Sequence, residues 1–201
     1  MPNLKIVLFG SPRIYLNSTP ISTDRRKAIA LLTYLVVNRQ TYSREALATL
    51  LWPEFTASKS FAYLRRTIWE INNALGDGWL SADRDQVSWQ NWENTWLDVA
   101  IYQGLVSRCL PGEASEQCLT DLEEATQLYQ GDFLAGFTLP DAPAFDEWQF
   151  FTAEKMRALQ SQALETLTIG YTKINEISRA IDYNHRWIAF DPVNEAAHRL
   201  M

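Results

Sequence analysis

The sequence predicts a mainly α-helical fold in which a small N-terminal α+β domain, residues 1–93, precedes an all-α domain, residues 94–201. Three observations lead to this prediction. Short apolar and β-branched runs separated by turn residues open the chain, as expected of a small antiparallel sheet. Three helical patterns and a hairpin pattern follow before residue 90. Beyond residue 118, helical patterns alternate with short turns.

The opening sheet is predicted from three short segments. Residues 4–9 are apolar except for Lys5 and end at the turn Gly10-Ser11-Pro12. A second strand is expected at residues 13–16, and residues 17–20 turn the chain before a third strand at Ile21-Ser22. Such a sheet precedes the helices in one subtype of the winged helix.

The first helix is predicted from Asp24 to about Val37, where the apolar residues share one helical stripe. Arg25, Arg26 and Lys27 stand at its start. Positive charge at a helix N-terminus opposes the helix dipole, which is understandable if a phosphate lies close by. The alternative reading is a basic cluster that is only solvated.

Two further helices are predicted with a short turn between them. Ser43 is placed to cap one of them, and Pro53 ends it. Ser58 is a second expected cap, for a helix from Lys59 to Leu75. A short helix, a turn and a longer helix is the order of a helix-turn-helix, whose second helix enters the major groove of DNA.

The helix over residues 59–75 divides into two faces at about 100° per residue. The predicted core stripe consists of Phe61, Leu64, Ile68, Ile71 and Leu75. The opposite face carries Lys59, Ala62, Arg66, Trp69, Glu70 and Asn73, with Tyr63 and Arg65 on its flanks. This outer face is the one that we expect to read bases.

A hairpin is predicted after this helix, because residues 79–82 and 86–89 can pair across Asp83-Arg84-Asp85. Helix-turn-helix and hairpin together make a winged helix-turn-helix. Arg84 at the tip is placed to touch the DNA backbone, although the two aspartates beside it weaken the attraction.

The candidate DNA contacts are basic or polar side chains of these elements, in which arginine can pair with guanine and lysine can hold phosphate. The base-contact candidates are Arg66, first, and Lys59, Ala62 and Tyr63. The backbone candidates are Arg25, Arg26, Lys27, Arg44, Arg65, Asn73 and Arg84. Taken singly, each has a plainer reading, since exposed basic side chains are usually only solvated and Tyr63 can pack on its neighbours.

The charge of the chain is divided between its halves. Residues 1–97 carry eleven Lys and Arg against eight Asp and Glu, a net charge of +3, whereas residues 98–201 carry seven against sixteen, a net charge of −9. DNA binding along the whole chain is hard to reconcile with this division. A DNA surface is therefore expected in the first half.

The second half is predicted to consist of helical hairpins. Apolar patterns run over residues 119–129, from about 145 to 171, and over 177–190, with Phe151 and Ile181 among the residues expected to face inward. Another helix begins after Asp191-Pro192. Such hairpins bury their faces by stacking on neighbours, so we expect that the chain was cut from a longer protein; the alternative is that it ends in a fraying helix.

The sequence contains no pattern typical of an enzyme. His185 and His198 have no cysteine or second histidine at ligand spacing, and no glycine-rich run matches a phosphate-binding loop. Neither a metal nor a cofactor is expected. Cys109 and Cys118 are expected to be reduced, because no signal peptide or membrane span is predicted and a cytoplasmic location follows.

Several segments resemble a known family. The N-terminal segments are Arg26-Lys27-Ala28 to Leu35, Ser43-Arg44-Glu45-Ala46-Leu47 to Leu51-Trp52-Pro53, and Leu64-Arg65-Arg66. The later ones are Trp96 to Val99, Tyr129 to Phe137 and Phe145 to Trp148. They resemble transcriptional activators of the antibiotic-regulatory-protein type. The resemblance implies an OmpR-like winged helix, then a tetratricopeptide-like bacterial transcriptional activation domain that contacts RNA polymerase at promoters.

Two functions of different classes remain from the sequence. The first is a regulator that binds double-stranded promoter DNA, with a homodimer on repeated half-sites as the expected functional unit. The alternative is a protein-interaction scaffold whose winged helix no longer binds DNA, which the modest charge of the first half leaves open.

Overall fold

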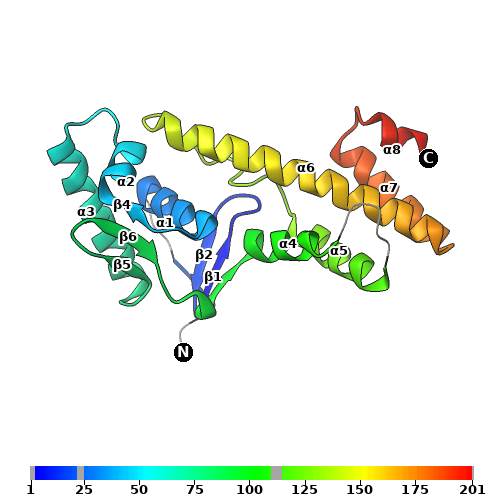
Figure 1. Cartoon of the computed structure of the whole chain (residues 1–201), viewed down its shortest axis with the longest axis horizontal. Coiled ribbons are helices and arrows are strands. Elements are labelled where there is room, and N and C mark those ends of the chain that lie inside the picture. The colour runs from blue at the N-terminus through cyan, green and yellow to red at the C-terminus, as the bar shows by residue number, and fades with distance from the viewer. Residues whose placement is uncertain (1–2, 22–24, 110–114, 201) are drawn as a thin grey trace. The chain divides into compact units, whose positions relative to one another are not determined.

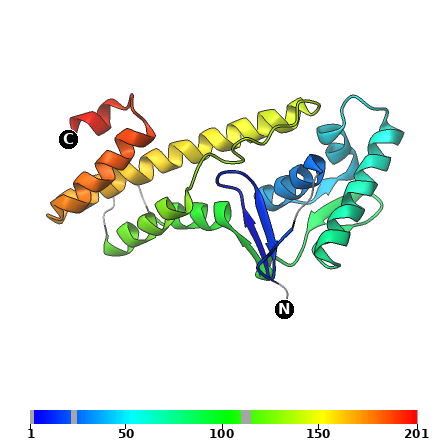
Figure 2. The ribbon, with the colours of Figure 1, turned by 180° about the vertical axis from the view of Figure 1, so that it is seen from behind.

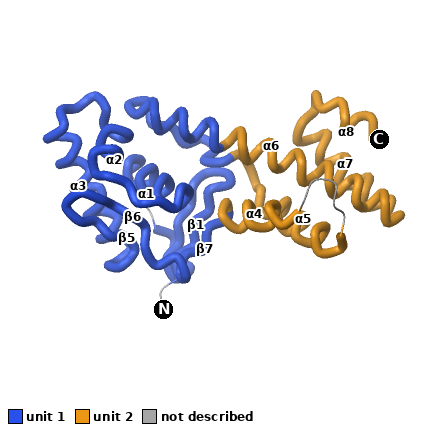
Figure 3. Tube along the Cα trace, in the orientation of Figure 1, with its two compact units in different colours: residues 1–98, 133–152 blue, residues 99–132, 153–201 orange. Residues whose placement is uncertain are grey.

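The structure is a computed structural model that describes residues 3–21, 25–109 and 115–200 and is mainly helical, with small sheets near the N-terminus (Figure 1). The predicted fold class is confirmed at this level. Contacts divide the chain into two compact units (Figure 3). The first unit comprises residues 1–98 and 133–152, and the second comprises residues 99–132 and 153–201. The predicted domain boundary after residue 93 stays a prediction.

Four strands form the first sheet, in the order β3-β2-β1-β7. Strand β1 (Leu4–Val7) pairs antiparallel with β2 (Arg13–Leu16), and β2 pairs antiparallel with β3 (Thr19–Pro20). On its other side β1 pairs in parallel with β7 (Thr95–Leu97). Strand β7, which has only three residues, was not predicted from the sequence.

The prediction of the third strand at Ile21-Ser22 was wrong. The observed strand β3 lies earlier, because Asn17 and Ser18 alone make the turn. Both adopt positive φ angles, 51° and 67°, which reverse the chain within two residues. Ser22 lies outside the described residues.

Three helices follow in the first unit: α1 (Arg26–Asn38), α2 (Arg44–Leu51) and α3 (Ala57–Leu75). In Figure 2, α1 lies between the β1–β2 strands and α3. Ser43 caps α2 as predicted, since its side chain accepts a hydrogen bond from the backbone N–H of Ala46 at 3.1 Å. Helix α1 contributes fully buried residues to the core of the first unit, among them Ala30, Leu31, Leu35 and Val36.

The start of α3 differs from the prediction. Thr56, and not Ser58, is the N-cap residue, and its side chain forms no capping hydrogen bond. Ser60 is buried and Phe61 is only partly buried, so the core stripe is shifted at this end. The Ser60 hydroxyl can be buried because it donates a hydrogen bond to the carbonyl of Trp52 at 3.0 Å.

The predicted hairpin is confirmed as β5 (Leu80–Ala82) and β6 (Gln86–Trp89), with Leu80 opposite Trp89. A two-residue strand, β4 (Tyr42–Ser43), joins it through β6 in the order β4-β6-β5. The hairpin thus attaches to the segment that precedes α2. A short 3-10 turn over Trp92–Asn94 leads on to β7.

A buried carboxylate fixes the end of β1. Asp98 begins α4 (Asp98–Ser107), and its side chain is 1% exposed. Its Oδ2 accepts hydrogen bonds from the backbone N–H groups of Leu8 and Phe9 at 2.8 and 2.9 Å. Buried backbone N–H groups need an acceptor, and the sheet provides none for these two. The Asp98 carboxylate provides it instead.

The second unit is helical, with α4 from Val99 onward, α5 (Glu116–Leu128), α7 (Ile177–Phe190), α8 (Glu195–Arg199) and the later part of α6 (Pro143–Lys173). Its small core cluster contains Leu164, Trp187 and Ala197. The Trp187 indole N–H donates to the Ser161 hydroxyl at 2.8 Å, so this buried ring also has its polar group satisfied.

Two residues that were predicted to face inward are exposed. Phe151 is 62% exposed and Ile181 is 50% exposed. Phe151 follows the buried Phe145 by six residues, and Ile181 precedes the buried Trp187 by six. Six residues at about 100° each leave a side chain about 120° away from its buried counterpart.

The cysteine prediction was also wrong, because Cys109 and Cys118 form a disulfide. Cys109 follows the end of α4, and Cys118 lies in the first turn of α5. Their Cα atoms are 5.3 Å apart, within the usual range for a disulfide.

Three hydrogen bonds meet on one carboxylate oxygen of the second unit. Glu123 Oε1 accepts from the hydroxyl groups of Tyr171 and Tyr183, each at 2.9 Å, and from the guanidinium of Arg179. Desolvation raises the pKa of Glu123, but these hydrogen bonds and the charge of Arg179 outweigh it and lower the pKa. Desolvation and the bond to Glu123 raise the pKa of Tyr171 and of Tyr183 to about 12.

We expect Asp98→Ala to lower the free energy of unfolding by about 2–5 kcal/mol, because two buried N–H groups lose their acceptor. Asp98→Asn keeps a carbonyl oxygen and should lose less. Urea denaturation measures both, with Asp77→Ala at an exposed turn residue as the control. An Asp98→Ala variant as stable as the wild type would contradict the role of this carboxylate.

We expect Glu123→Gln to lower the free energy of unfolding by about 1–2 kcal/mol at pH 7, because charge-assisted hydrogen bonds to a partly exposed group are lost. A lowered pKa contributes stability above the unfolded-state value of about 4.3 and loses it as the pH falls further. The difference from the wild type should therefore shrink below pH 4.3 in denaturation curves. Glu124→Gln at the exposed neighbouring residue is the control, and equal effects of both variants would refute this assignment.

Candidate nucleic-acid interface

The connection between α2 and α3 orients the helix that was predicted to read bases. Trp52 ends α2 and is 7% exposed, so its ring anchors the connection in the first unit. Its ring centroid lies 6.1 Å from that of Tyr63 on α3. With the hydrogen bond from Ser60 to the Trp52 carbonyl, these contacts fix the first turns of α3 against the end of α2.

The outer side of α3 is exposed along most of its length. The exposed residues on this side and its flanks are Lys59, Ala62, Tyr63, Arg65, Arg66, Trp69 and Asn73. All four base-contact candidates are thus on an accessible surface of one helix. Their contact with DNA stays a prediction.

Tyr63 also packs on its neighbours, as the plainer reading of this residue expected. It is 39% exposed, and its ring centroid lies 5.1 Å from that of Phe55. Part of its ring is therefore committed to the turn between α2 and α3. The exposed part of its side chain remains available to a ligand.

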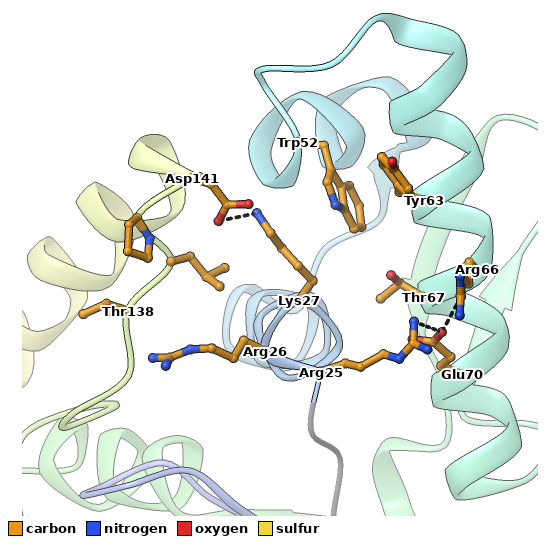
Figure 4. Close-up of a pocket in the computed structure, with 12 residues that line it drawn as sticks. Arg25, Arg26, Lys27, Trp52, Tyr63, Arg66, Thr67, Glu70, Thr138 and Asp141 are labelled. Atoms are coloured by element: carbon orange, nitrogen blue, oxygen red, sulfur yellow. Dashed lines mark hydrogen bonds and ion pairs between the residues drawn. The ribbon is translucent and has the colours of Figure 1, made fainter.

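Glu70 joins two of the predicted DNA contacts. Its Oε1 lies 2.5 Å from Nη1 of Arg25 and 3.1 Å from Nε of Arg66. Figure 4 shows Arg25 from α1 and Arg66 from α3 directed at this carboxylate. The Glu70 side chain is 13% exposed, whereas the two arginines are 50% and 63% exposed. Both guanidinium groups therefore reach solvent while one carboxylate aligns them.

Arg26 and Lys27 point away from this pair (Figure 4). The Lys27 ammonium lies 3.0 Å from Oδ1 of Asp141 and donates a hydrogen bond to the carbonyl of Leu51. The guanidinium of Arg26 lies 5.1 Å from the ring centroid of Phe137. The three basic residues at the start of α1 thus spread in three directions. Among the basic side chains that form ion pairs in this region, that of Lys27 is the least accessible, at 17% exposed.

The hairpin tip is held by hydrogen bonds. Arg44 donates from Nη1 to the carbonyl of Asp83 at 2.6 Å, so part of its guanidinium serves the hairpin. Asp83 Oδ1 accepts from the backbone N–H groups of Gln86 and Asp85, which lowers the pKa of Asp83. Arg84 lies exposed between the two aspartates.

Two residues of this surface were not among the candidates. Trp69 is 62% exposed on the outer side of α3, and Glu70 aligns two arginines. The helical projection already placed both on the outer face. The spacing of Arg66 and Glu70, four residues apart, is a signal in the sequence for their ion pair. The pairing of Glu70 with Arg25 required the fold.

Within residues 3–21, 25–109 and 115–200, no group of three or more His, Cys, Asp and Glu side chains is arranged to hold a metal ion. None of the helices in the part of the chain that the structure describes is both long and apolar enough to cross a membrane.

Comparison with known proteins identifies the second half of the chain. Residues 97–201 match the model of the bacterial transcriptional activator domain. No curated protein matches the sequence. Among solved structures, the chain is similar to Mycobacterium tuberculosis EmbR in complex with a low affinity phosphopeptide, with a TM-score of 0.62 at 19% identity. That match covers all of this chain and 64% of the EmbR chain, and at this identity it shows a shared fold.

The domain match covers more than half of the chain, and the fold match extends over its whole length. These two findings agree with the segments from which the family resemblance was inferred. The chain therefore belongs to the bacterial transcriptional activator domain family.

Proposed function

We propose that this chain is a sequence-specific DNA-binding transcriptional activator whose first unit is an OmpR-like winged helix. The observation that carries the proposal is the exposed basic side of α3, which lies in a helix, turn, helix and hairpin order. In such a fold the second helix of the pair enters the major groove, and the hairpin reaches the backbone. Membership in a family of transcriptional activators supports this use of the unit.

Arg66 is the residue to which we assign base recognition. Its side chain is 63% exposed, and Glu70 holds it by Nε, which leaves the terminal nitrogens of the guanidinium for a base. Two parallel donors match the O6 and N7 acceptors of guanine in the major groove. Lys59, Ala62 and Tyr63 border the same side of the helix.

Backbone contacts are assigned to cations around this helix. The proposed set is Arg25, Arg26, Lys27, Arg44, Arg65, Asn73 and Arg84. Arg65 and Arg84 are exposed, whereas Lys27 is mostly covered, so we rank Lys27 below them. Neutralising phosphates releases counterions, which makes the affinity fall with increasing salt concentration.

The acidic helical half is proposed to contact RNA polymerase or another protein partner, because its net charge of −9 is unsuited to DNA. Two copies on repeated half-sites would raise the affinity by acting together. The absence of catalysis and the cytoplasmic location stay predictions, and so does the tetratricopeptide-like character of the helical hairpins.

We expect Arg66→Ala to weaken binding to the preferred sequence by about 5- to 150-fold and to reduce the preference for it over unrelated duplexes. Lys59→Ala should weaken binding to all duplexes alike and reduce the salt slope by about 0.9, if it contacts one phosphate. Fluorescence anisotropy across a salt series, with DNA fragments from the upstream region of the protein's own gene, measures both effects.

Lys155→Ala is the control, because this exposed lysine lies in the second unit and should leave DNA binding unchanged. A folded wild-type protein that binds none of these fragments at low salt would overturn the proposal. The interaction scaffold would then be the better account.

A further inference from the structure

A hollow of about 450 Å³ lies in the first unit between the start of α1, the flank of α3 and residues 138–141. Its volume falls within the range of small-molecule sites. Figure 4 shows the side chains that line it. Arg66 lines this hollow and also borders the outer side of α3, so the hollow and the proposed DNA surface share one residue.

The lining carries an excess of positive charge. Four basic side chains, Arg25, Arg26, Lys27 and Arg66, face two carboxylates, Glu70 and Asp141. The lining therefore has a formal charge of +2. Arg26 forms no ion pair with any residue that the structure describes and rests on the Phe137 ring. A dianion is the ligand that balances this charge.

The arrangement of the cations favours a phosphate group. Arg25 and Arg66 present guanidinium groups, which donate two parallel hydrogen bonds to phosphate oxygens. The first backbone N–H groups of α1 also lie at this end, where the helix dipole favours an anion. Residue 25 caps the helix without a side-chain hydrogen bond.

Part of the lining is apolar. Trp52 and Tyr63 contribute neighbouring rings, and Leu139 and Pro140 also line the hollow. Figure 4 shows the two aromatic rings above the basic side chains. Flat apolar groups pack well on such rings. The polar and apolar parts together fit a ligand that carries both a phosphate and a ring.

We propose that this hollow is a binding site for a small organic phosphate monoester that carries an aromatic ring. A monoester bears a charge close to −2 at pH 7, because its second pKa is about 6. A phosphodiester of the DNA backbone bears a single charge and leaves the lining unbalanced. The proposal concerns ligand binding by the protein without DNA, so it does not depend on the proposed function.

Phenyl phosphate is the probe that tests the site, with isothermal titration calorimetry on the whole chain without DNA. We expect binding at pH 7.5 that weakens by about tenfold in Arg26→Ala, because the lining loses one of its four positive charges. Arg26 is exposed, so the substitution should not disturb folding. Arg13→Ala, at an exposed arginine outside the hollow, is the matched control and should bind as the wild type does.

Two comparisons separate the possible ligand types. Methyl phenyl phosphate has the same ring but one charge, and should bind at least tenfold more weakly than phenyl phosphate. Binding of phenyl phosphate should also weaken between pH 7.5 and 5.5, as the monoester gains a proton. If the diester bound equally well, the hollow would be a binding site for the DNA backbone, and the proposal would be overturned. Absence of binding, or binding that is unchanged in Arg26→Ala, would overturn it as well.

Discussion

Helix α3 must bury one side for the first unit to fold and must expose the other side for the unit to meet a ligand. Leu64, Ile68 and Ile71 satisfy the first requirement, since all three are buried against the rest of the unit. The second requirement is met by the opposite side, where Trp69 is 62% exposed. Because both sides belong to one rigid helix, the packing of the buried side determines how the exposed side is presented.

Glu70 lies at the border between the two sides and links them electrostatically. It ties α1 to α3 through Arg25 and orients Arg66 within α3. A partly exposed ion pair of this kind contributes little to stability. Its larger consequence is geometric, because it determines where two guanidinium groups point. The same carboxylate therefore influences both the proposed base contact and the hollow beside it.

Much of the first unit was predictable because its signals are local. Ser43 capped its helix, and the hairpin paired across residues 83–85, since caps and turns depend on neighbours in sequence. The strands β4 and β7 were missed because they have two and three residues and obtain their hydrogen bonds from distant segments. The buried role of Asp98 was missed for the same reason, because its hydrogen-bond partners are separated from it by 90 and 89 residues.

The candidate surface was only partly predictable, for a related reason. The helical projection gave the exposed side of α3 correctly, because a helix has a fixed period. It gave no information on which cations are paired with carboxylates. The pairing of Lys27 with Asp141 and of Arg25 with Glu70 depends on tertiary structure. For Phe151 and Ile181, the helical pattern predicted burial, but both side chains are exposed. Apolar residues of a helix need not all face a core.

The exposed side of α3 is the surface that we propose binds DNA. The most direct measurement is a ¹⁵N–¹H NMR titration of the labelled protein with its best-bound duplex, with the Trp69 indole signal assigned through Trp69→Phe. We predict that the Trp69 indole and the backbone amide of Ala62 shift most. Shifts that spare α3 and are confined to the second unit would contradict the account.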